Sequence, residues 1–149
     1  MIESAFPMSA QTTAPFQPVL IVAGPTASGK SALALDLADA FDGVVINADS
    51  MQVYRELCVL SARPNDSEIA RVPHRLYGVL SGREACSAGK WRDMAMAEIA
   101  ECHAKGKLPI ITGGTGMYLN ALTEGIAPIP DIPAGIRAQV TAKLEKDGH

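Results

Sequence analysis

The sequence has no apolar stretch near the roughly 20 residues that a membrane-spanning helix requires. Its first residues lack the basic start and the continuous apolar run of a secretory signal peptide. It has only three cysteines, an odd number, and no two of them show the C-x-x-C spacing of redox or zinc motifs. These absences predict a cytoplasmic protein with no membrane association and with reduced thiols at Cys58, Cys86 and Cys102.

An excess of positive charge is also missing. The formal net charge is −3, which disfavours a protein that binds nucleic acids non-specifically through a basic surface. A nucleic-acid substrate on a local patch is still compatible with this charge, because one segment is locally basic. That segment contains Arg55, Arg63, Arg71, Arg75, Arg83, Lys90 and Arg92. The default interpretation is that these side chains form a solvated face. The more specific interpretation is that they form a patch that binds an RNA backbone.

The length and composition indicate one domain. A chain of 149 residues, 48% of them hydrophobic, is large enough to bury a substantial core. Residues 1–18 contain three prolines and are predicted to be a disordered tail. Residues 19–125 are predicted to form the core. A proline-rich connector at residues 126–133 then leads into an amphipathic helix at residues 136–146.

Within the core, short apolar runs alternate with helical patterns. Strands are predicted at residues 19–23, 44–48, 74–80 and 108–112, the first two of them fully buried. Helices are predicted at residues 30–41 and 87–105, and from residue 117 onward. This alternation is typical of an α/β fold in which helices cover both faces of a parallel sheet.

Two of these helices show an apolar face that we expect to pack on the sheet. In the first helix, the apolar residues at i, i+4 and i+8 are Leu33, Leu37 and Phe41. In the second helix, that face consists of Trp91, Ala95, Ile99 and Cys102. Ser87 is expected to cap the second helix at its amino end.

The stretch GPTASGKS, from Gly24 to Ser31, matches the phosphate-loop pattern G-x-x-x-x-G-K-[ST] at every fixed position. Glycine at both ends lets the chain turn sharply and lets backbone N–H groups approach an anion closely. The helix that follows points its positive end at the phosphates, and Lys30 adds a full charge. The Ser31 hydroxyl can ligate Mg²⁺. We therefore expect a P-loop NTPase-like parallel sheet, flanked by helices, that binds a polyphosphate and magnesium as nucleotide- and ATP-binding proteins do.

Two further loops follow predicted strands. Asp49 follows the second strand and could hold Mg²⁺ through water, accept a proton from a nucleophile, or cap a helix. The GGTG stretch permits close approach of a ligand and offers the Thr115 hydroxyl. Because ligands bind beyond the carboxyl ends of parallel strands, we expect Lys30, Asp49 and Thr115 to line one cleft. Gln52 carries an amide that could read a base edge, although a solvated surface residue is the simpler interpretation.

The combination of motifs resembles one family. GPTASGKS at residues 24–31, NADSMQVYR at residues 47–55 and PIITGGTGMYLNAL at residues 109–122 occur in the order and spacing of the tRNA dimethylallyltransferase (isopentenyl transferase) family. SAGKWRDMA at residues 87–95 is also similar to that family. The resemblance extends from residue 19 to the end of the chain.

The resemblance implies a substrate and a mechanism. It implies that the loop binds the diphosphate of dimethylallyl diphosphate through Gly24, Pro25, Thr26, Ala27, Ser28, Gly29, Lys30 and Ser31. It places Mg²⁺ near Ser31 and makes Asp49 the general base for the exocyclic amine of an adenosine beside the anticodon, with Lys30 and Thr115 as further catalytic residues. It also implies a set of tRNA-binding residues: Asp49, Ser50, Met51, Gln52, Thr115 and Arg137.

The resemblance also implies that residues 126–149 are the beginning of a helical tRNA-binding insertion that is cut short. We expect a monomer whose partners are tRNA and dimethylallyl diphosphate. Three other hypotheses use the same phosphate loop: a small nucleotide or metabolite kinase, an inactive fragment that only binds diphosphate, and an enzyme that prenylates free AMP. The kinase leaves the motifs after the second and fourth predicted strands unexplained.

Overall fold

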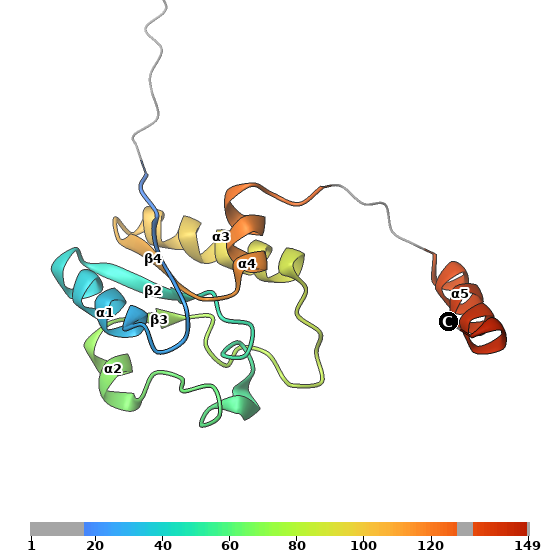
Figure 1. The fold of residues 1–149 in the computed structure, drawn as a ribbon. Coiled ribbons are helices and arrows are strands. Elements are labelled where there is room, and N and C mark those ends of the chain that lie inside the picture. Colours follow the sequence, from blue (N-terminus) through green and yellow to red (C-terminus); the bar gives the residue numbers. More distant parts are fainter. Residues whose placement is uncertain (1–16, 128–132, 149) are drawn as a thin grey trace, which may run out of the picture.

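A four-stranded parallel sheet lies at the centre of the molecule (Figure 1). The computed structural model describes residues 17–127 and 133–148, so most of the predicted tail lies outside the described residues. The strands are β1 (Leu20–Ala23), β2 (Gly43–Asn47), β3 (His74–Arg75) and β4 (Leu108–Gly113), in the order β1-β4-β2-β3. β4, the last strand in the chain, therefore lies between the first two and pairs in parallel with both.

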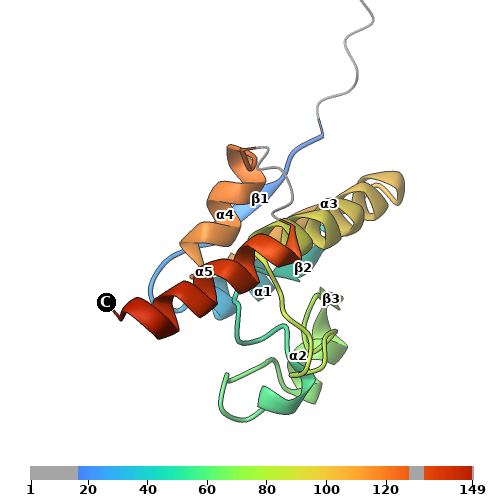
Figure 2. The same ribbon diagram turned by 90° about the vertical axis from the view of Figure 1, so that its right-hand side faces the viewer.

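Helices cover both faces of this sheet, which confirms the predicted fold class (Figures 1 and 2). The helices are α1 (Lys30–Ala40), α2 (Asp66–Arg71), α3 (Ala88–Ala104), α4 (Gly116–Thr123) and α5 (Ala134–Asp147), with a 3-10 turn, η1, at Arg55–Leu57. α1 packs on one face of the sheet and α3 and α4 on the other, because alternate strand residues point to opposite sides.

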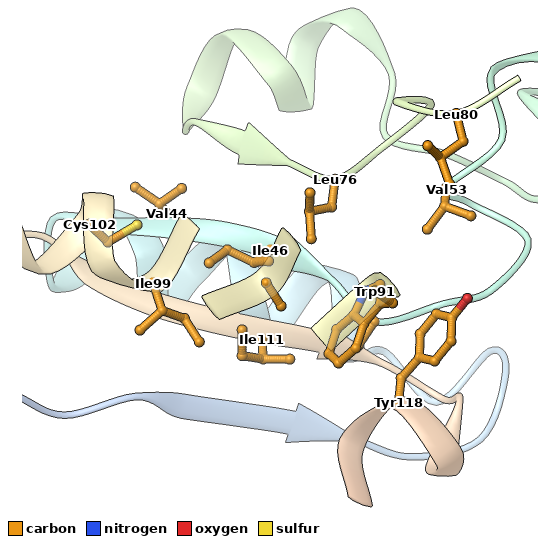
Figure 3. Close-up of a cluster of buried hydrophobic side chains, with 12 residues drawn as sticks. Val44, Ile46, Val53, Leu76, Leu80, Trp91, Ile99, Cys102, Ile111 and Tyr118 are labelled. Atoms are coloured by element: carbon orange, nitrogen blue, oxygen red, sulfur yellow. The ribbon is translucent and has the colours of Figure 1, made fainter. Parts of the chain in front are cut away.

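The two cores follow this alternation. Val45 and Ile110 are buried on the side of α1, whereas Ile46 and Ile111 are buried on the side of α3 and α4, among the side chains drawn in Figure 3. All five residues of β2 are buried, as predicted for a strand with helices on both faces. The predicted face of α3 is confirmed in the same cluster, and the Ser87 hydroxyl accepts a hydrogen bond from the backbone N–H of Lys90 (3.1 Å), which confirms the predicted cap.

Two predictions about strands were wrong. β1 is not fully buried: it is an edge strand, paired with β4 alone among the described residues, and Ile21 is 38% exposed. The predicted third strand, residues 74–80, forms only at His74 and Arg75. Leu76 adopts a left-handed conformation with φ 61°, which turns the chain out of the strand.

The predicted apolar face of α1 was partly wrong: Leu37 is half-buried and packs against the core on this side of the sheet, but the other two predicted residues are exposed. Leu33 and Phe41 are 52% and 61% exposed, and the buried residues of α1 are Ala34, Leu35 and Ala38. The small alanine side chains let the helix axis approach the sheet closely, so the packed face is rotated away from the larger residues. Periodicity scored on large apolar residues misses such a face.

α2 and η1 were not predicted. α2 begins with a capping box: the Asn65 side chain accepts bonds from Ser67 and Glu68, and the Glu68 carboxylate accepts from the Asn65 N–H (2.8 Å). The N-x-x-E spacing was a signal for this helix. α5 forms where a helix was predicted, and every side chain that the structure describes in it is exposed. Among the described residues, no helix combines the length and the apolar character needed to cross a membrane.

Candidate functional site

The phosphate loop connects β1 to α1 at the carboxyl edge of the sheet. Ala27 and Gly29 both have left-handed backbone conformations, with φ 61° and 84°. Gly29 occupies the N-cap position of α1 and has no side chain to cap it. The first N–H groups of α1 therefore have no side-chain partner, and they are available to an anion at the positive end of the helix.

Lys30 and Ser31 begin α1 beside this loop. The Lys30 ammonium donates a hydrogen bond to the Pro25 carbonyl, which folds the lysine back over the loop. Ser31 is exposed in the first turn of the helix. A full positive charge, a hydroxyl and uncapped N–H groups thus lie within a few residues of each other, which is an arrangement suited to a polyphosphate.

Asp49 lies in the turn that follows β2. One carboxylate oxygen, Oδ1, accepts a hydrogen bond from the backbone N–H of Met51 (2.8 Å). No helix begins at this turn, since η1 starts only at Arg55, so the interpretation of Asp49 as a helix cap was wrong. Among the described residues, the other carboxylate oxygen accepts no hydrogen bond and forms no ion pair, so it is available to a ligand.

The loop after β4 joins the Asp49 turn directly. The Thr115 hydroxyl oxygen accepts a hydrogen bond from the Ser50 N–H (3.0 Å), and the Thr115 N–H donates to the Ala48 carbonyl (3.2 Å). Thr115 holds the N-cap position of α4, yet its side chain makes no capping bond to that helix. The hydroxyl hydrogen therefore remains for a ligand, and α4 presents a second uncapped helix amino end.

Two glycines make this close approach sterically feasible. A Cβ atom on Gly113 would lie 2.3 Å from the backbone C and O atoms of Ala48, and one on Gly114 would lie 3.1 Å from the Gly24 carbonyl oxygen. The end of β4 therefore touches the Asp49 turn on one side and the phosphate loop on the other. The structure brings the loops of Lys30, Asp49 and Thr115 together at one edge of the sheet.

The other predicted site residues have different surroundings. The Gln52 amide donates to the carbonyl of Ser61 (2.8 Å), so its nitrogen is used within its own loop. Met51 is 47% exposed beside Asp49. Arg137 is exposed on α5, and it forms no hydrogen bond or ion pair with the described residues of the three loops. The segment that connects α5 to the core includes residues 128–132, which lie outside the described residues.

The locally basic segment is largely paired. Arg71 binds Asp36 and Asp39, and both carboxylates raise the pKa of its guanidinium. The remaining ion pairs of the segment are Arg75–Glu98, Lys90–Glu84 and Arg92–Asp93. Arg63 donates to the backbone carbonyls of Tyr54 and Arg55. This pairing favours the interpretation of a solvated face over that of a patch for RNA.

Sequence reasoning missed the contacts that three buried residues, Asn47, Trp91 and Tyr118, make beneath the site. The indole N–H of Trp91 donates to the Asn47 carbonyl (2.9 Å), and the Trp91 ring stacks on Tyr118 with ring centroids 4.7 Å apart (Figure 3). Burial raises the pKa of the Tyr118 hydroxyl. Trp91 was recognised only as part of an apolar face. A buried asparagine at the end of an apolar strand was the available signal for a polar role.

Within the part of the chain that the structure describes, the cysteines and acidic residues form no metal site of their own. Cys58, Cys86 and Cys102 are unpaired thiols. In residues 17–127 and 133–148, no group of three or more His, Cys, Asp or Glu side chains could hold a metal ion. A hard cation at the phosphate loop would therefore take most of its oxygen ligands from a bound phosphate chain and from water, as Mg²⁺ commonly does.

The family model and the relatives that match this chain belong to one kind of enzyme. A family model for IPP transferase matches residues 52–149. The chain is 58% identical over 126 residues to the tRNA dimethylallyltransferase of Rhodospirillum centenum, which covers 85% of this chain and 40% of that protein. It is 57% identical over 127 residues to the tRNA dimethylallyltransferase of Rhodospirillum rubrum, with coverage of 85% and 39%. The chain thus spans about two fifths of the length of these relatives.

Solved structures give the same result for the fold. The full-length tRNA isopentenylpyrophosphate transferase from Bacillus halodurans matches with a TM-score of 0.74 and 33% identity, over 89% of this chain and 44% of that chain. A eukaryotic dimethylallyltransferase acting on tRNA matches with a TM-score of 0.73 and 28% identity, over 88% of this chain and 32% of that chain. The described core is therefore similar to the corresponding part of these larger enzymes.

Proposed function

The chain belongs to the IPP transferase family, and on that premise we propose that it acts in tRNA modification. It transfers a dimethylallyl group from dimethylallyl diphosphate to the exocyclic amine of the adenosine beside the anticodon. The observation that carries this proposal is the contact among three loops at the carboxyl edge of the sheet. They place an anion-binding loop, a carboxylate and a hydroxyl next to one another.

The phosphate loop binds the diphosphate of the donor. Its backbone N–H groups and the amino end of α1 are not capped by side chains, and Lys30 lies over the loop. When the allylic C–O bond breaks, negative charge accumulates on the departing diphosphate. Fixed N–H dipoles and an ammonium stabilise that charge without reorganising, which lowers the barrier to departure.

Asp49 and Thr115 act on the nucleophile, which is the exocyclic nitrogen of the adenosine. The exocyclic nitrogen forms a bond to the allylic carbon while the C–O bond breaks, and the diphosphate leaves with the bonding electrons. The nitrogen then loses a proton to the Asp49 carboxylate, at the oxygen that is not engaged by Met51. The Thr115 hydroxyl, held by the Ser50 N–H, orients the adenine. Ser50, Met51 and Gln52 line the same turn and contact the nucleotide.

Mg²⁺ bound at Ser31 would add positive charge beside the diphosphate. The exposed Ser31 hydroxyl in the first turn of α1 fits a cation that takes its other oxygen ligands from a phosphate chain and water. α5, with Arg137 exposed, begins the part of the protein that grips tRNA. We further propose that the protein is a monomer and that it acts in the cytoplasm, where its three unpaired thiols would remain reduced.

An assay with radiolabelled dimethylallyl diphosphate and an anticodon stem-loop tests the proposal. The expected result is label on the RNA, with release of diphosphate. Transfer of γ-phosphate from ATP to a small acceptor would instead identify a kinase. Preference for AMP over the stem-loop would identify a free-nucleotide prenyltransferase. Binding of the donor with no transfer to either acceptor would leave a diphosphate-binding fragment and would refute the proposed activity of this chain.

A further inference from the structure

Asn47 is a fully buried polar side chain at the last position of β2. Both the nitrogen and the oxygen of its side-chain amide form hydrogen bonds. The Nδ2 group donates to the carbonyls of Asp49 (3.0 Å) and Leu76 (3.1 Å), and the Oδ1 atom accepts from the Asp49 N–H (2.9 Å). Two carbonyls face the nitrogen and an N–H faces the oxygen, so the amide orientation is fixed by its partners.

One side chain therefore holds the Asp49 backbone from both sides. The N–H and the C=O of Asp49 are bound to the same amide, which restricts rotation about the two backbone bonds that aim the carboxylate. The Asn47 backbone is anchored in turn, because its carbonyl accepts the bond from Trp91 (2.9 Å). The third partner, Leu76, belongs to the turn after β3, where φ is 61°, so the amide also connects the Asp49 turn to that segment.

We propose that Asn47 is a positioning residue that acts through Asp49. It makes no contact with substrate, and its role is to keep the Asp49 carboxylate aimed at the edge where Thr115 and the phosphate loop meet. The kinetic part of this inference rests on the proposed function. A displacement of about 1 Å in a reacting group can cost roughly 100-fold in rate. We therefore expect Asn47→Ala to lower kcat by about 10- to 100-fold while the KM for dimethylallyl diphosphate changes little.

A double-mutant cycle separates positioning from general damage. If Asn47 acts only through Asp49, then Asn47→Ala in an Asp49→Ala background lowers kcat no further, because the group it aims is already absent. Independent, multiplicative losses would overturn the inference. Thr112→Val is the matched control: Thr112 is the other buried polar residue among those described, it is the register partner of Asn47, and its hydroxyl makes one long bond to Val22 (3.4 Å). Its kcat should stay within about twofold of wild type.

Amide hydrogen exchange tests the same inference without turnover. Asn47→Ala removes the acceptor of the Asp49 N–H, so exchange at Asp49 and Met51 should accelerate by at least about tenfold, with Thr112→Val unchanged. Unaltered exchange at Asp49 would refute positioning even if the variant were inactive. A wild-type protein that shows no allyl transfer would refute the proposed function, and the exchange experiment would still decide the role of Asn47.

Discussion

The contact between β4 and the Asp49 turn can be broken by one methyl group. In Gly113→Ala, the new Cβ would lie 2.3 Å from the backbone C and O atoms of Ala48, whereas non-bonded carbon atoms prefer about 3.5–4.0 Å. The atoms that the Cβ would meet belong to the backbone of Ala48, directly after β2, so no side chain can rotate away. The two strand ends must separate by about 1 Å or more.

The free-energy cost of this separation comes from the hydrogen bonds beside the contact and from the steric overlap itself. The hydrogen bonds Thr115 N–H to Ala48 and Ser50 N–H to Thr115 are worth about 1 kcal/mol each. Overpacking itself costs typically about 1–3 kcal/mol. A total of about 3–5 kcal/mol corresponds to a fall in Tm of roughly 6–20 °C for a domain of this size. Turnover should fall by about 100-fold, because Thr115 and Asp49 move apart.

Thermal unfolding followed by circular dichroism measures the fall in Tm of Gly113→Ala. Gly116→Ala is the matched control. Gly116 is three residues away, in α4, and a Cβ there meets nothing within 4 Å. Alanine in a helix is favoured over glycine by up to about 1 kcal/mol, so the Tm of the control should be unchanged or higher. If Gly113→Ala kept the wild-type Tm and turnover, the packing of β4 against Ala48 would be refuted.

Four further predictions concern the site and its support. Lys30→Ala should abolish binding of dimethylallyl diphosphate in calorimetric titration, and retained affinity would contradict its role. Asp49→Asn, which keeps an oxygen for the turn, should preserve that affinity and lower turnover by about 10²–10⁴-fold, and near-normal turnover would show that Asp49 is not the base. Trp91→Phe leaves the Asn47 carbonyl buried without its donor and should destabilise the protein by about 1–3 kcal/mol in urea unfolding. Burial lowers the pKa of His74 below its ordinary value of 6.5. As the pH falls, the imidazole is therefore protonated in the unfolded chain before it is protonated in the folded protein, so this contribution to stability is full above pH 6.5 and is lost below it. His74→Gln should reduce the loss of Tm at acidic pH, as measured by thermal unfolding over a pH series.

Local features of the sequence predicted most of the elements. The first and second strands, α1, α3 and α5 appear close to their predicted positions because apolar runs, helical periodicity and the Ser87 cap are all local features of the sequence. The face of α1 was only partly correct, since Leu37 packs against the core while Ala34 and Ala38 are more deeply buried than Leu33 and Phe41. The third strand was too long because Leu76 leaves the strand with a positive φ, which no apolar pattern reveals.

The sequence by itself determined the phosphate loop, the acidic and hydroxyl residues of the neighbouring loops, and the family, since each is written in a few adjacent residues. Only the tertiary structure decided that β4 lies between β1 and β2, that Thr115 binds the Ser50 N–H, and that Asn47 holds Asp49 in place. These contacts join segments as many as 90 positions apart, as in the pairing of Leu20 with Ile110. They depend on which strand order buries the most apolar surface and satisfies the most backbone groups, a property of the whole chain that no local window contains.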